Sequence, residues 1–434
     1  MIIHVVQPGD TLYSIAITYG VTVSKLVQDN GLENVDYLVT GQTIVILHSD
    51  QTYIVRQGDT LAGIADAHGV SLIQLLRNNP FLSDRDFIYP GEVLTISYDN
   101  KISDIQTYGY TYPFIDRNVL RKTLPYLTYL GIFNYRATMG GGVADFGTND
   151  TEAIKIARAF GVPPIMFITT LSSVGEPNLD IAFDILTKHE SQIHFIDSIL
   201  EIMKSKGYYG VNLSFQYFNA ANLLLYEDFL TNVTSRLNSE GYLVFVTVNP
   251  NLNFRDDTVT FEMVDYTRIG LLANTLIFLA YDWAYTLSPP IPLSTRKLRV
   301  FLDYITSQVP ANKIMIGLTV IGYDWELPFI PGTTKAHALS TEAALQLARD
   351  TGSAILYDDN SEAPYFYYND PFTGNEHVVW FKDARSVDAY ANLVPEYNFQ
   401  GISIWNIMQF FNQLWLIINS QFEIQTLPVT DLLP

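Results

Sequence analysis

From residue 126 onward, short apolar stretches alternate with longer stretches in which apolar residues recur every three or four positions. The short stretches predict buried strands and the longer ones predict amphipathic helices, so the pattern is typical of repeated βα units. The predicted strands cover residues 126–135, 141–146, 163–171, 208–218, 242–250, 275–283, 313–325 and 400–407, and the clearest helices cover residues 193–207 and 294–308.

These strands and helices, spread over about 300 residues, predict an α/β fold in which the strands close into a (β/α)8 TIM barrel. A doubly wound open sheet is the alternative. It is disfavoured because no Gly-rich phosphate-binding loop follows any of the predicted strands.

The barrel domain is expected to span residues 125–434, with one interruption. Residues 326–395 are too many for a single crossover helix. They contain an amphipathic stretch at 340–352 and aromatic, strand-like stretches at 365–370 and 377–381. We therefore expect a small α+β insertion before the last strand, which forms a wall of the cleft at the open end of the barrel.

A repeat precedes the barrel. Residues 4–30 return with the same pattern at residues 53–79, and each copy ends in a Gly turn followed by a β-rich stretch. Each copy predicts a small βααβ domain. We call these domains unit 1 (residues 1–48) and unit 2 (residues 52–98), and we interpret residues 99–124 as a linker and lead-in to the barrel.

The composition narrows the possible ligands. The formal net charge of −20 at pH 7 disfavours binding to nucleic acid and to anionic membranes, which require concentrated Lys and Arg. Hydrophobic residues make up 48% of the chain and charged residues 16%, so the chain is globular. The absence of Cys excludes disulfides, thiol catalysis and Cys-bound zinc. We expect a neutral or partly cationic ligand.

Signals for export, membrane insertion and metal binding are weak. The segment 1-MIIHVVQPGDTL lacks a basic start and a sustained apolar core, and the apolar run 276-LIFLA-280 is too short to span a membrane. His189 and His194 would point about 140° apart on a helix, so they could not share a zinc ion. We therefore expect a soluble protein without a signal peptide, a metal or a cofactor.

Both units carry Gly-Asp-Thr-Leu at the start of their first predicted helix. These residues are Gly9, Asp10, Thr11 and Leu12 in unit 1, and Gly58, Asp59, Thr60 and Leu61 in unit 2. The Asp-Thr pair predicts a helix N-cap, because its side-chain oxygens can accept hydrogen bonds from the first turn. With their shared spacing and closing Gly turn, both units resemble LysM domains. The resemblance implies that these residues help bind N-acetylglucosamine polymers, peptidoglycan or chitin, in a groove beside the loop after the second helix.

The barrel also resembles a known family. The segments 125-PYLTYLGIFNY, 281-YDWAY, 312-NKIMIGLTVIGYDW and 401-GISIWNIMQFFNQLWLI are similar to family-18 glycoside hydrolases, in particular to the spore cortex-lytic N-acetylglucosaminidases with tandem LysM domains. The resemblance implies a sugar cleft at the C-terminal ends of the strands. It implies that Tyr281 bonds the substrate acetamide and that Trp405 stacks on the central sugar. Further substrate contacts are implied for Asn212, Tyr217, Asn249, Asp282, Tyr323, Asp324 and Trp325.

One predicted strand carries an unusual row of neutral polar residues. In 207-GYYGVNLSFQYF-218, the alternation of a strand places Asn212, Ser214 and Gln216 on one face. The family's acidic signature, D-x-x-D-x-D-x-E, falls on Tyr209 and on these three residues. Gln216 thus stands at the position of the general acid, and Ser214 at that of the Asp that orients the substrate acetamide.

These two differences remove the proton donor and a negative charge. The family uses substrate-assisted catalysis, an exception to the scheme with two enzyme carboxylates. An amide at position 216 has no proton to transfer, and loss of general-acid assistance costs roughly 10²- to 10⁴-fold in rate. Loss of the charged group at position 214 adds on the order of 3 kcal/mol to the barrier. The sequence therefore predicts little or no turnover.

Four other carboxylates were considered as substitutes. Glu227 and Asp228 fall in the helix after this strand, on an expected surface face, where ion pairing or solvation is their predicted role. Asp282 lies at the correct end of the barrel, but in the family this position contacts sugar hydroxyls on the wrong side of the scissile bond. Asp324 is similar in kind.

The sequence thus leaves two main functions open, and a scaffold role with an empty cleft is a third, minor alternative. The first is a lectin-like protein that binds an N-acetylglucosamine polymer, most plausibly the peptidoglycan of the spore cortex. The second is an active N-acetylglucosaminidase that uses an unorthodox acid, or whose Ser214 and Gln216 were introduced to trap substrate. The absence of a signal peptide suggests synthesis in the mother cell and association with the spore coat or cortex; the alternative is a cytoplasmic or cell-wall-associated protein.

Overall fold

The computed structural model describes residues 1–434 except residues 33–36, 84, 86, 99–100, 173–175, 177, 216–218, 251, 256–257, 280–293, 331–332 and 428–434. Eight parallel strands form a closed barrel, because β5 pairs with both β20 and β6. The barrel strands in spatial order are β5 (Ser103–Thr111), β6 (Tyr129–Ala137), β8 (Pro164–Thr169), β9 (Gly210–Ser214), β10 (Leu243–Val248), β13 (Thr275–Phe278), β14 (Ile314–Thr319) and β20 (Gly401–Trp405). This confirms the predicted barrel and excludes the open sheet.

Three strand assignments differ from the prediction. The first barrel strand is β5, which lies in the segment that we interpreted as a linker. The stretch 141–146 instead forms β7 (Val143–Asp145), which pairs antiparallel with the end of β6 outside the barrel. The stretch 313–325 is divided, because β14 ends at Thr319 and β15 (Gly322–Glu326) belongs to the insertion. β5 was missed because Ile105 is its one aliphatic residue, and its other buried residues are Tyr, Thr and Gly.

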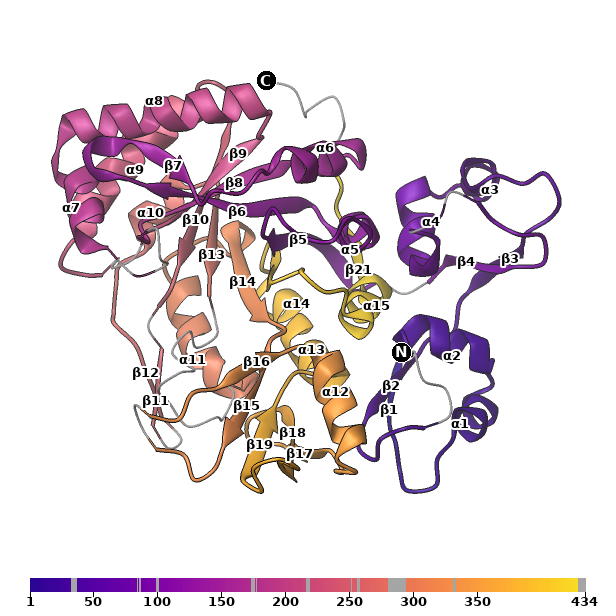
Figure 1. The fold of residues 1–434 in the computed structure, drawn as a ribbon. Helices are drawn as coiled ribbons and strands as arrows, with labels where there is room; N and C mark the ends of the chain where they lie inside the picture. Colours follow the sequence, from indigo (N-terminus) through magenta and orange to yellow (C-terminus); the bar gives the residue numbers. More distant parts are fainter. Residues whose placement is uncertain are drawn as a thin grey trace.

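Helices cover the outside of the barrel (Figure 1). They are α5 (Arg117–Thr123), α6 (Thr151–Ala159), α7 (Leu179–Thr187), α8 (His189–Lys206), α9 (Leu223–Asn238), α10 (Thr267–Leu272), α11 (Thr295–Thr306), α13 (Ala384–Ala391), α14 (Leu393–Tyr397) and α15 (Asn412–Gln421). Shorter elements are η2 (Leu124–Tyr126), η3 (Met139–Gly141), η4 (Ala311–Lys313), the hairpin β11 (Asn253–Arg255) and β12 (Thr258–Thr260), and β21 (Phe422–Ile424) beside β5. The main core lies between these helices and the strands, and a second, largely aromatic core fills the barrel.

The insertion forms a five-stranded antiparallel sheet with one helix. The sheet order is β16 (His337–Leu339), β15, β19 (Glu376–Trp380), β18 (Ala363–Asn369) and β17 (Leu356–Asp358). Helix α12 (Thr341–Asp350) contributes Ala344 and Ala348 to a core with Phe366 and Val379 of the sheet. The predicted α+β insertion is therefore present, and its first strand begins at Gly322.

Both units have the predicted βααβ order. Unit 1 contains β1 (Ile2–Val5), α1 (Leu12–Tyr19), α2 (Val23–Asn30) and β2 (Thr43–Ile46); unit 2 contains β3 (Gln51–Ile54), α3 (Leu61–His68), α4 (Leu72–Asn78), η1 (Pro80–Leu82) and β4 (Val93–Ser97). Asn30 holds the end of α2 to the closing strand, because its amide donates to the Leu26 and Val45 carbonyls and its oxygen accepts from Val45 N. Asn79 makes the equivalent three bonds in unit 2.

Both units dock along helix α15, on one side of the barrel (Figure 1). Near the start of the helix, Gln413 Nε2 donates to the Thr43 carbonyl of unit 1 at 2.7 Å. Near its end, Asn419 Nδ2 donates to Asn78 Oδ1 of unit 2 at 2.8 Å. Because α15 follows β20, its start lies at the C-terminal end of the barrel, and so does unit 1. In the described part of the chain, no helix is both long and apolar enough to cross a membrane.

Candidate functional site

Strand β9 carries Ser214 to the open end of the barrel and buries Asn212 beneath it. Ser214 is partly exposed, whereas Asn212 has no exposed surface. Asn212 Nδ2 donates to Tyr108 Oη at 3.1 Å, and Asn212 Oδ1 accepts from Thr247 Oγ1 at 2.8 Å. The expected direct contact between Asn212 and substrate is therefore not what the structure shows. Its side chain joins β9 to β5 and β10 inside the barrel.

The tyrosines of this network stay protonated over the whole physiological range. Tyr110 Oη lies 3.1 Å from Thr247 Oγ1. Burial raises the pKa of Tyr110 to about 12, and it also raises the pKa of Tyr108 well above its usual value. The network beneath Ser214 is consequently neutral, and it offers no proton donor of ordinary acidity.

Four predicted site residues lie outside the described residues: Gln216, Tyr217, Tyr281 and Asp282. Asn249 is described; it follows β10 at the same end of the barrel and is partly exposed. No group of three or more His, Asp or Glu side chains that could hold a metal ion occurs among the residues that the structure describes.

Trp405 ends β20 and forms part of an aromatic cluster. Its ring centroid lies 5.3 Å from that of Tyr110, 6.1 Å from Tyr112 and 5.9 Å from Phe133. Tyr112 also stacks on Phe114, whose side chain is 67% exposed. Trp405 thus lies where the sequence placed it, although only 9% of its surface is exposed.

Sequence reasoning missed Tyr112, Phe114 and Phe133 as part of this cluster. Tyr112 and Phe114 follow β5, the strand that was interpreted as a linker. The signal was present in 108-YGYTYPF-114, where aromatic residues occupy every second position as in a half-buried strand. The insertion adds another aromatic pair, since the Tyr365 and Trp380 rings stack with centroids 4.5 Å apart.

The three predicted site residues of β15 differ in their surroundings. Tyr323 is partly exposed and lies opposite Trp380 in the sheet. Asp324 Oδ2 accepts from Tyr368 Oη at 2.7 Å, and Asp324 Oδ1 lies 2.9 Å from His377 Nδ1. Trp325 has no exposed surface and packs edge-on against Phe329. The prediction that Trp325 lines the cleft is therefore wrong, because this ring forms part of the insertion's packing.

The alternative carboxylates on α9 are also accounted for. Glu227 is only 8% exposed, and its Oε2 lies 3.7 Å from Arg268 Nε. The expected ion pair is present, but the expected surface position is wrong for Glu227, because this residue faces the core of the helical layer. Asp228 is exposed, as expected.

In each Gly-Asp-Thr turn, the Thr side chain caps the following helix, and the space around the Gly backbone is unoccupied. Thr11 and Thr60 are the helix N-caps, which accept from the backbone of Ser14 and Gly63 at 3.0 Å. Asp10 and Asp59 are not caps. They close the turn instead, accepting at 2.7 Å from Gln7 N and Arg56 N, respectively. These backbone hydrogen bonds lower the pKa of both carboxyl groups.

The remaining residues of the two turns divide into backbone and core. Gly9 and Gly58 have φ angles of 91° and 90°, and a Cβ at either would meet no atom within 4 Å, so both turns are open to a ligand. Leu12 is only 4% exposed and belongs to the core of unit 1, so it supports the turn from below. Leu61 packs partly buried against the core of unit 2.

Comparison with known proteins agrees with this architecture. Residues 167–409 match the model of glycosyl hydrolases family 18, and residues 4–47 and 53–97 match the LysM domain. The chain is 33% identical over 431 residues to the cortical fragment-lytic enzyme of Bacillus subtilis, covering 98% of this chain and 99% of that protein. It is 35% identical over 426 residues to the enzyme of the same name from Bacillus anthracis, covering 96% and 98%.

A solved structure gives the same picture. The spore cortex-lytic enzyme SleL of Bacillus cereus superposes with a TM-score of 0.79 at 32% identity, covering 98% of this chain and all of that one. The similarity thus extends over the two units, the barrel and the insertion. The chain belongs to glycosyl hydrolase family 18 and carries two N-terminal LysM domains.

Proposed function

We propose that this protein binds peptidoglycan of the spore cortex through its LysM units and its barrel, with little or no hydrolysis. The observation that carries the proposal is that Ser214, at the end of the fourth barrel strand, and Gln216, two residues later in the sequence, stand where the family places an Asp and its general acid. The aromatic cluster around Trp405 supports retained sugar binding, because such rings offer an apolar face to the C–H surface of a pyranose.

The surroundings of two of the four alternative carboxylates, Asp324 and Glu227, support little or no hydrolysis. A substitute acid must reach the scissile oxygen and exchange a proton with it. Asp324 is engaged by Tyr368 and His377, and Glu227 is paired with Arg268 outside the barrel. Neither is free for that task in the described structure.

An active cortex-lytic N-acetylglucosaminidase is the second candidate. It is favoured by the relatives, which are named as lytic enzymes and which align with nearly the whole chain. On this alternative the protein would cleave the same polymer that it binds, through an acid other than residue 216.

Restoring the two carboxylates separates the candidates. Release of reducing ends from purified cortex fragments would be measured for the wild type and for a variant with Ser214→Asp and Gln216→Glu. We expect the variant to be at least 10²-fold faster, since it regains both the proton donor and the charge that orients the acetamide, each worth roughly that factor. Equal and rapid release by both proteins would refute the binding-only function.

Localisation follows from the same proposal. We propose that the protein associates with the spore, where its polymer is found, as its spore cortex-lytic relatives suggest. Binding to purified spore peptidoglycan in a sedimentation assay, with cellulose as the control polymer, would test the specificity for acetamido sugars.

A further inference from the structure

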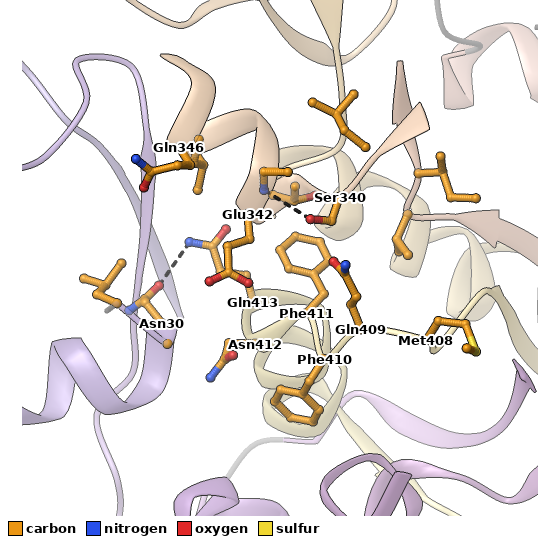
Figure 2. Close-up of a pocket in the computed structure, with 18 of the residues that line it drawn as sticks. Asn30, Ser340, Glu342, Gln346, Met408, Gln409, Phe410, Phe411, Asn412 and Gln413 are labelled. Carbon is orange, nitrogen blue, oxygen red and sulfur yellow. Dashed lines mark hydrogen bonds between the residues drawn. The ribbon is translucent and has the colours of Figure 1, made fainter. Parts of the chain in front are cut away.

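A pocket of 490 Å³ lies where unit 1, the insertion and the barrel meet. Its lining comes from the end of α2, from the first turns of α12 and from the segment that joins β20 to α15 (Figure 2). This volume falls in the range of about 300–1,000 Å³ that is typical of small-molecule sites. The aromatic residues of the cluster around Trp405 do not line the pocket. One wall of the pocket contains Val320, the residue that follows β14.

Unit 1 is fixed to the other two walls of the pocket. Ile355 N of the insertion donates to the Thr40 carbonyl at 2.9 Å. Gly41 lies so close that a Cβ there would come within 1.9 Å of the Ile355 carbonyl oxygen. In unit 2 the equivalent Gly91 has open space around it. This close contact holds unit 1 against the insertion, and unit 2 makes no equivalent contact at Gly91.

The lining has the chemistry of a neutral sugar site. Only Glu342 and Arg349 are charged, so the pocket has no net charge. The side chains of Gln409 and Asn412 line the pocket; Gln409 is exposed and Asn412 is partly exposed. Figure 2 shows Phe411 next to Gln409. Side-chain amides can bond hydroxyl and acetamido groups, while an aromatic ring packs on the apolar side of a pyranose.

The position of the pocket connects it to the glycan groove implied for unit 1. Asn30 ends α2, and Gly31 and Leu32 begin the loop after this helix; all three residues line the pocket. The pocket therefore adjoins unit 1 at the start of the loop that is implied to border the groove.

We propose that this pocket is an additional subsite for an uncharged acetamido-sugar unit of the polymer, adjacent to the groove of unit 1. The proposal rests on the proposed polymer binding. It adds that unit 1 and the barrel hold one glycan chain in a fixed register, since the walls of the subsite are joined rigidly. Unit 2 has no such junction with the insertion in the described structure.

Filling the pocket tests the proposal. Ala343 is exposed on α12 and lines the pocket, so Ala343→Tyr fills it without removing a contact. Affinity would be measured by calorimetry for N-acetylglucosamine oligomers of two to six units. We expect Ala343→Tyr to weaken binding of the longest oligomers by about tenfold, or about 1.4 kcal/mol. Binding of the dimer should not change, because only a longer chain can occupy the groove and the pocket together.

Two controls keep the outcomes distinct. Ala159→Tyr changes an exposed Ala at the end of α6, outside the pocket, and should leave binding of every oligomer unchanged. Gln409→Ala should also weaken binding of the longest oligomers, but by a smaller factor. This variant provides the test if Ala343→Tyr fails to fold. Equal affinity of wild type and both pocket variants for the long oligomers overturns the subsite. Failure of the wild type to bind any oligomer overturns the proposed function itself.

Discussion

At the residue scale, the buried Asp150 is a charged group held by several hydrogen bonds. Its carboxylate has no exposed surface and accepts hydrogen bonds at 2.6 Å from Tyr135 Oη, Tyr208 Oη and Lys206 Nζ. Burial alone would raise the pKa of Asp150, but the donors from Lys206, Tyr135 and Tyr208 outweigh it and the pKa is lowered. This cluster lies outside the proposed sugar site and ties α6 and α8 to β6.

Asp150→Asn should destabilise the fold. The change leaves Lys206 without its partner, and breaking a buried ion pair costs about 3–5 kcal/mol. Since the folded-state pKa of Asp150 is lowered, its contribution is complete above the unfolded pKa of about 3.9 and is lost as the pH falls below that value. We therefore expect the difference in free energy of unfolding between wild type and variant to be large at pH 7 and to shrink below pH 4, as measured by urea denaturation.

The matched control is Asp197→Asn on the exposed face of α8. An exposed carboxylate without such donors should contribute less than about 0.5 kcal/mol at either pH. A loss for Asp150→Asn no larger than that of the control would show that the cluster does not stabilise the fold.

At the element scale, apolar periodicity predicted most of the barrel but not its first strand. Strands β8, β10 and β14 are aliphatic and stand out in the sequence. β5 does not stand out in the sequence, because the side chains that it points into the barrel are Tyr108 and Tyr110. On its outer face, Gly109 has no side chain and lies close to Leu127 and Ile407. These residues become a core only when β6 and β20 close around them. The boundary between β14 and β15 was missed for a related reason, since nothing in an apolar run shows that the chain changes sheet.

The sequence predicted some residues of the candidate site correctly, as it did most of the barrel strands. Trp405 and Ser214 lie at the strand ends to which the family resemblance assigned them. The burial of Asn212 and Trp325 could not be read from alternation, because it depends on which neighbours pack across the barrel and the insertion. Tyr112 and Phe114 were lost together with β5.

Gly131 on β6 offers a test of the packing between β5 and β6. A Cβ at this position would come within 2.3 Å of Tyr108 Oη. Gly131→Ala should therefore displace the Tyr108 ring and disturb its bond with Asn212, and overpacking of this kind costs about 1–3 kcal/mol. The free energy of unfolding in urea measures the effect. An unchanged stability would mean that the aromatic core of the barrel is looser than the contacts indicate.

At the scale of the whole molecule, the two LysM units are docked on the barrel rather than tethered to it. Unit 2 inserts Arg77, which is 4% exposed and donates to the carbonyls of Pro125 and Ile424 near the N-terminal end of the barrel. Burial lowers the pKa of this guanidinium to about 10, so it still carries its charge at neutral pH. Unit 1 sits at the opposite end, beside the insertion.

The equivalent glycines of the two closing turns allow the docking of unit 1 to be measured. Gly41 and Gly91 have φ angles of 86° and 94°, so an Ala at either pays the same left-handed strain of about 1–2 kcal/mol. Only Gly41→Ala also collides with Ile355. We expect Gly41→Ala to speed hydrogen–deuterium exchange at the Ile355 amide, whose bond to Thr40 would open, while Gly91→Ala leaves it unchanged. If both variants exchange at the wild-type rate, the contact between Gly41 and Ile355 does not hold unit 1 to the insertion, and the fixed register between its groove and the barrel loses that support.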